Sequence, residues 1–120
     1  MSGFHTFDRL QGQLLTVGQQ RFFIFRSSEG KEHMIPDKCP HRGGPLSRGH
    51  WDAGNCRLQC PWHNRSWPES VLIKRQLPTI KVQSRWTVFL DVDEPGALCR
   101  IHDIPVANID ALNIDVHKSA

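Results

Sequence analysis

Two short segments of the chain each offer one cysteine and one histidine. The first reads Cys39-x-His41 and the second reads Cys60-x-x-His63, with eighteen residues between them. Two ligands from each of two segments form the pattern of a metal site, and the mixed set limits the metals that fit. A proline follows each cysteine and two glycines lie just beyond the first histidine, which excludes helices at the ligands. The fold must therefore bring two loops together.

Two kinds of metal centre fit this ligand set. In an iron–sulfur cluster, the two thiolates would bind one iron and the two imidazoles the other, and the neutral imidazoles would raise the reduction potential. A Cys2His2 zinc site is the alternative. Zinc fingers, however, normally place both cysteines together and both histidines together on a helix. Because each segment here supplies one of each, the cluster is the favoured interpretation.

The composition favours strands over helices. The chain has 120 residues, enough for one domain; 38% are hydrophobic, and glycine and proline together number 17. Short runs of β-branched and aromatic residues between these breakers are typical of an all-β, loop-rich fold. A domain this small often gains stability from a bound metal.

The apolar runs predict where the strands lie. Residues 37–68 are rich in glycine and proline and are predicted as loops, broken by one short strand, whereas residues 103–120 are predicted as an extension along the sheet. The predicted strands are residues 20–26, 31–35, 57–59, 71–74, 79–83 and 86–92.

Nothing in the sequence predicts a membrane segment. No apolar stretch approaches the roughly 20 residues that span a bilayer, and residues 1–5 lack a secretory leader. We therefore expect a soluble, cytoplasmic protein with no membrane partner. In a reducing cytosol its four cysteines are not expected to form disulfides, and we interpret Cys56 and Cys99 as buried thiols.

Charge is distributed unevenly along the chain. Residues 1–90 carry a net charge of +7 and residues 91–120 a net charge of −4. This asymmetry favours a basic face that docks an acidic protein. Nucleic acid is not an expected partner, because the basic residues are scattered and no nucleic-acid motif accompanies them. A basic ring around the centre would consist of Arg42, Arg48, Arg57 and Arg65.

Residues 36–63 resemble the Rieske iron–sulfur family, in its oxygenase-ferredoxin branch. The resemblance implies stacked antiparallel sheets with a small cluster-binding subdomain made of two loops. It implies one [2Fe–2S] cluster per chain, with Cys39 and Cys60 on one iron and His41 and His63 on the other. The domain would cover residues 1–102, with cluster-binding loops in 37–68, and residues 103–120 would be a C-terminal extension.

Departures from the family pattern suggest a low-potential member. Rieske proteins of respiratory complexes join their two loops by a disulfide, and Gly44 and Trp62 stand at the matching positions here. Those proteins also place two hydroxyls near the cluster, where this chain has Arg65 and Trp67. Fewer hydrogen bonds to sulfur would leave the reduced cluster less stabilised. We therefore expect a reduction potential of about −150 mV rather than about +300 mV.

The resemblance implies an electron carrier rather than an enzyme. The carrier would take electrons from a flavin or iron–sulfur reductase and deliver them to a terminal oxygenase, typically of the non-haem iron type. Arg42, directly after the first histidine, resembles the residue at this position in the Rieske domain of oxygenase α-subunits. Those subunits need a second, catalytic domain, which does not fit in this chain. Two alternatives stay open: a small subunit of an assimilatory nitrite reductase, which Asn64 suggests, and a non-redox zinc-binding interaction module.

Overall fold

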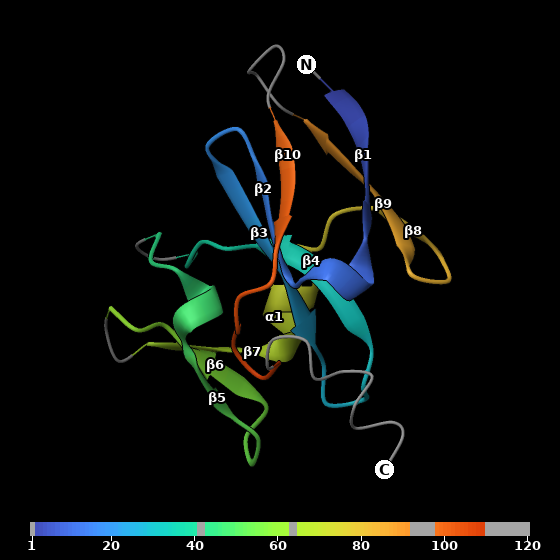
Figure 1. The fold of residues 1–120 in the computed structure, drawn as a ribbon. Coiled ribbons are helices and arrows are strands. Elements are labelled where there is room, and N and C mark those ends of the chain that lie inside the picture. The colour runs from blue at the N-terminus through green and yellow to red at the C-terminus, as the bar shows by residue number, and fades with distance from the viewer. Residues whose placement is uncertain (1, 41–42, 63–64, 92–97, 110–120) are drawn as a thin grey trace.

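Strands dominate the structure, a computed structural model that describes residues 2–40, 43–62, 65–91 and 98–109. They form three antiparallel sheets, in the orders β1-β9-β8, β10-β2-β3-β4 and β5-β6-β7 (Figure 1). The predicted all-β class with stacked antiparallel sheets is confirmed. The strands are β1 (Ser2–Asp8), β2 (Leu14–Val17), β3 (Gln20–Arg26), β4 (Glu32–Pro36), β5 (His50–Asp52), β6 (Arg57–Gln59), β7 (Ser66–Pro68), β8 (Thr79–Val82), β9 (Arg85–Asp91) and β10 (Cys99–His102).

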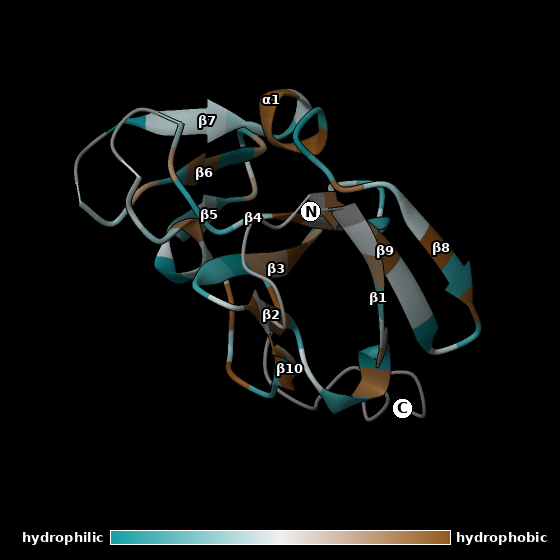
Figure 2. Cartoon of the chain, turned by 90° about the horizontal axis from the view of Figure 1, so that it is seen from above, coloured by the Kyte–Doolittle hydropathy of each residue, from teal (hydrophilic) through white to brown (hydrophobic). Residues whose placement is uncertain are grey.

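Strand β3 lies at the centre of the core. Its four consecutive residues Phe22–Phe25 are all buried, so the strand is covered on both faces. A strand covered in this way has a continuous apolar run rather than an alternating one. β2 and β4 pair with it on either side. Figure 2 shows hydrophobic segments on β2, β3 and β9, and buried residues of β9 such as Val88 join the same core.

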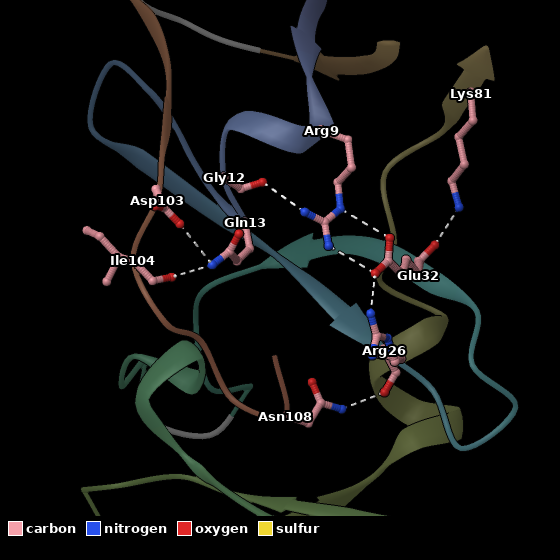
Figure 3. Close-up of polar contacts among 9 residues, drawn as sticks. All are labelled: Arg9, Gly12, Gln13, Arg26, Glu32, Lys81, Asp103, Ile104 and Asn108. Carbon is pink, nitrogen blue, oxygen red and sulfur yellow. Dashed lines mark hydrogen bonds and ion pairs between the residues drawn. The ribbon is translucent and has the colours of Figure 1, made fainter. Parts of the chain in front are cut away.

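A partly buried ion pair ties the first sheet to the second. Arg9, in the 3-10 turn Arg9–Gln11 after β1, donates to both carboxylate oxygens of Glu32 on β4, at 3.1 and 2.9 Å (Figure 3). Arg26 donates to the same carboxylate at 3.0 Å. Burial raises the pKa of Glu32, but the hydrogen bonds and charges of the two arginines outweigh burial and hold that pKa below its usual value.

The third sheet carries the segment predicted to bind metal. Three short strands stand where the sequence predicted only one, because β5 and β7 pair on the two sides of the predicted strand β6. Residues 103–109 run from β10 towards this sheet, and the Ala107 N–H donates to the Ser47 carbonyl in the 3-10 turn Leu46–Arg48. Val106, Ala107 and Ile109 are buried in the common core. Residues 110–120, the rest of the predicted extension, lie outside the described residues.

The strand predicted at residues 71–74 is wrong. The segment forms the helix α1 (Glu69–Ile73). Its apolar run is too short for periodicity to separate a strand from a helix. The local signals favour the helix, since Pro68 stands at its N-cap and Glu69 puts a negative charge in its first turn. Only Leu72 is fully buried, as expected for a helix that covers the core with one face.

No helix within the described ranges could cross a bilayer, and α1 has only five residues.

Candidate metal centre

Both candidate cysteine ligands are buried at the ends of strands. Cys39 follows β4 and Cys60 follows β6, and their exposed fractions are 2% and 1%. Neither forms a disulfide. His41 and His63 lie outside the described residues, so the structure does not place them. The two cysteines of the predicted ligand set therefore lie in the core, each where a strand gives way to a loop.

The first loop closes on itself through the backbone. The Gly43 N–H donates to the Cys39 carbonyl at 2.8 Å, and the Cys39 N–H donates to the Gly44 carbonyl at 2.8 Å. Gly43 has a φ of +77°, a left-handed conformation that glycine adopts without steric cost. The Cys39 backbone is thus held from two sides, which restricts the direction of its side chain.

Gly44 is the point where the two loops meet. A Cβ atom at this position would lie 2.7 Å from the Cys60 sulfur and 3.0 Å from the Trp62 ring. Gly44 also binds the Cys39 backbone. Gly44 therefore connects the Cys39 loop to the Cys60 loop, and only a residue without a side chain permits so close an approach between them.

The second loop leaves one aromatic ring at the surface. The Cys60 N–H donates to the Arg65 carbonyl at 3.1 Å and closes this loop. Trp62 is 65% exposed, although its ring lies against Gly44. A surface hollow of about 540 Å³ lies beside it, lined by Arg48, Gly49, His50, Gln59, Cys60, Pro61 and Trp62. Solvent or a partner can therefore approach the backbone beside Cys60 through this hollow.

The Cys39 sulfur accepts a hydrogen bond from a second tryptophan. Trp67 on β7 donates its indole N–H to Cys39 Sγ at 3.4 Å. The sequence predicted fewer hydrogen bonds to sulfur here, because hydroxyl-bearing residues are missing. That reasoning overlooked the indole N–H, which is itself a donor.

A positive charge also lies near Cys39. Arg75, just beyond α1, donates to the Lys38 carbonyl at 2.8 Å. Burial lowers the pKa of Arg75, and the charge of the Cys39 thiolate acts in the opposite direction. Sequence reasoning did not single out Arg75, because its closeness to Cys39 depends on the path of α1.

A buried carboxylate anchors the first loop at both ends. Asp37 accepts from the backbone N–H and the hydroxyl of Ser47, each at 2.7 Å, and pairs with Arg21 at 3.0 Å. Its side chain is fully buried. Because Asp37 precedes Cys39 by two residues and Ser47 follows Gly44 by three, this contact closes the loop at its base.

Two arginines of the predicted basic ring and the two cysteines outside the ligand set remain to be placed. Arg57 donates to the Ser66 hydroxyl and carbonyl at 2.8 and 2.9 Å. Arg42 lies outside the described residues. Cys56 and Cys99 are only partly buried, so their interpretation as buried thiols is wrong. Cys56 stands in the turn between β5 and β6 with a φ of +52°, and residues 53–55 of this turn are exposed.

Comparisons with known proteins agree with this picture. A family model described as Rieske [2Fe-2S] domain matches residues 6–86. The 4beta-methylsterol monooxygenase of Methylococcus capsulatus is 43% identical over 44 residues, which cover 37% of this chain and 11% of that protein. Chlorophyllide a oxygenase of Arabidopsis thaliana is 30% identical over 91 residues, covering 66% and 16%. Apoptosis-inducing factor 3 of Mus musculus is 36% identical over 61 residues, covering 49% and 10%. The chain thus spans between 10% and 16% of the length of these relatives.

Proposed function

The chain belongs to the Rieske [2Fe–2S] domain family, and on this premise we propose that Cys39 and Cys60 hold one iron of its [2Fe–2S] cluster and His41 and His63 the other. Such a cluster accepts and returns one electron at a time. The proposed residues offer the two thiolates and two imidazoles that a centre of this type requires.

Three observations support this ligand set. The two thiols are almost fully buried, so the protein core would partly shield a metal that they hold from solvent. The Gly44 carbonyl accepts from the Cys39 N–H, and a Cβ at Gly44 would collide with the Cys60 sulfur, so both cysteines border Gly44. Within the described ranges, no group of three or more His, Cys, Asp or Glu side chains forms a metal site. This agrees with a ligand set that is completed by His41 and His63, which stand outside those ranges.

The activity that fits best is electron transfer from a flavin or iron–sulfur reductase to a terminal oxygenase. The observation that carries this proposal is the exposed ring of Trp62 beside a buried ligand. Cys60 lies in the core, yet the hollow of about 540 Å³ reaches it from the surface. Arg48 lines that hollow with positive charge, which fits an acidic docking surface on the partner. Two of the relatives are oxygenases by name, which points to the same class of partner.

Cysteine variants test the ligand proposal. The full chain would be purified without oxygen, and its iron, acid-labile sulfide and zinc would be measured. We expect Cys39→Ser and Cys60→Ser to lose the iron, because a hydroxyl replaces each thiolate. Cys56→Ser and Cys99→Ser are matched controls in the same chain and should keep it. Stoichiometric zinc without iron in the wild type would instead favour the zinc-binding interaction module.

Reduction kinetics test the carrier proposal. NADH with a flavin-dependent ferredoxin reductase should reduce the loaded protein, and Trp62→Ala should slow this step while leaving the reduction potential unchanged. Trp51→Ala is the control, because Trp51 is only partly buried and its ring packs edge-on against Phe25. Equal slowing by both variants would contradict docking at Trp62. Copurification with a large sirohaem subunit would favour the nitrite reductase alternative.

A further inference from the structure

The indole of Trp67 makes a contact that the ligand set does not require. Its Nε1 lies 3.4 Å from the Cys39 sulfur, within the usual range for a hydrogen bond to sulfur. The two residues are 28 positions apart in the sequence, with Cys39 in the first loop and Trp67 on strand β7. We propose that Trp67 is a positioning residue that sets the reduction potential by donating its indole N–H to the Cys39 thiolate. This inference rests on the proposed role of Cys39 as an iron ligand.

The fold holds the Trp67 ring in one orientation. Trp67 is the central residue of β7 and pairs with Leu58 on β6. On one side of it, Ser66 is bound by two hydrogen bonds from Arg57; on the other, Pro68 has a fixed φ. The ring is only partly buried, but it packs against the core. The sheet and its packing therefore hold the indole N–H in the direction of the Cys39 sulfur.

Arg65 strengthens this donor. Its guanidinium lies over the Trp67 ring, 5.7 Å from the ring centroid. A cation over an aromatic face is attracted to the ring's electrons. By drawing those electrons towards itself, the cation leaves the indole N–H more positive. Because Arg65 contacts the Trp67 ring and Trp67 contacts the Cys39 sulfur, the positive charge acts on the thiolate through the indole.

A hydrogen bond to sulfur favours the reduced cluster. Reduction adds one electron and makes the sulfur atoms more negative, and a donor binds a more negative acceptor more strongly. The Trp67 N–H therefore stabilises the reduced form more than the oxidised form, and the potential rises. Hydrogen bonds to the sulfurs are among the factors that set the potentials of iron–sulfur proteins.

Trp51 provides a matched control. Leu58 pairs with Trp51 on β5 and with Trp67 on β7, so the two tryptophans lie on the same face of the same sheet. Both are partly buried and pack against the core. The Trp51 ring meets Phe25 edge-on at 5.3 Å. Replacing either tryptophan by phenylalanine removes one indole N–H and a similar volume, but only Trp67→Phe removes the donor to Cys39.

Redox titration of the full, cluster-loaded chain tests the inference. If the N–H favours the reduced form about tenfold, Trp67→Phe lowers the potential by about 59 mV, the one-electron equivalent of that factor. Trp51→Phe should leave the potential at the wild-type value. Equal potentials for wild type and Trp67→Phe, or equal shifts for the two variants, would overturn the inference.

A spectroscopic measurement separates the hydrogen bond from a packing effect. Resonance Raman spectra in water and in deuterium oxide report how exchangeable protons affect the iron–cysteine stretches. We expect the deuterium shift to shrink in Trp67→Phe but not in Trp51→Phe. If Trp67→Phe loads poorly, benzothienylalanine at position 67 keeps the ring shape and replaces N–H by sulfur, with the same expected results.

The inference and the proposed function fail in different ways. Zinc in place of iron in the wild-type protein overturns both. A loaded cluster whose potential does not respond to Trp67→Phe overturns the inference alone and leaves the ligand proposal standing.

Discussion

Replacing Gly44 by alanine should abolish cluster binding. The new Cβ would lie 2.7 Å from the Cys60 sulfur, about 0.7 Å short of the 3.4 Å at which ordinary contact begins. The Trp62 ring at 3.0 Å blocks retreat on another side, and the Gly44 carbonyl is bound by the Cys39 N–H. Overpacking of this kind costs about 1–3 kcal/mol. Moving the sulfur by 0.7 Å also exceeds the tolerance of about 0.2 Å in metal–ligand distances.

Iron content and visible absorbance after anaerobic purification measure this effect. We expect Gly44→Ala to retain little iron, whereas Gly54→Ala should load like the wild type. Gly54 is the control because a Cβ there would meet only Asp52 Oδ1, at an ordinary 3.5 Å. Gly44→Ala protein with the iron, sulfide and spectrum of the wild type would refute the placement of Cys60 as a ligand beside Gly44.

Three further predictions concern the carboxylates of Glu32 and Asp37. Glu32→Gln should lower the free energy of unfolding by about 2 kcal/mol, between the values for exposed and buried ion pairs, because Arg9 loses its charged partner; urea denaturation measures this. The stability that Glu32 contributes should be complete above its unfolded-state pKa of about 4.5 and should be lost as the pH falls through its lower folded-state pKa. The difference in melting temperature between wild type and Glu32→Gln should accordingly shrink on acidification, and a constant difference down to pH 2 would contradict this. Asp37→Ala should lower the free energy of unfolding by about 1–3 kcal/mol, because Ser47 loses its buried acceptor. The same variant should lose its cluster to a chelator faster than the wild type. Asp52→Ala is the control at an exposed turn and should show neither effect.

The sequence predicted the strands at residues 20–26 and 31–35 well because their signals are local. The apolar run at residues 20–26 is bounded by turn residues, and the structure pairs it with β4 from Arg26↔Glu32 to Phe22↔Pro36. The segment at residues 71–74 has no such clear signal. Its apolar residues are compatible with a strand, and only the preceding proline and the packing of Leu72 decide for the helix.

The sequence predicts candidate ligands for the site but not their surroundings. Cysteine and histidine spacing is visible in the chain itself, so Cys39 and Cys60 could be singled out without a structure. The Trp67 hydrogen bond joins residues 28 positions apart, and the Asp37–Ser47 contact joins residues 10 positions apart. Contacts of this kind arise from the relative placement of loops and strands, which no local pattern encodes.

The nitrogen ligands give the most direct test of the central claim. The full chain would be labelled with ¹⁵N-histidine, loaded with its cluster, reduced with dithionite and studied by pulsed electron paramagnetic resonance. The proposed ligand set predicts two iron-bound histidine nitrogens, and loss of this signal in His41→Ala and His63→Ala but not in the His50→Ala control. A reduced cluster without histidine nitrogen coupling, or a colourless protein holding zinc, would contradict the assignment of His41 and His63 to the second iron.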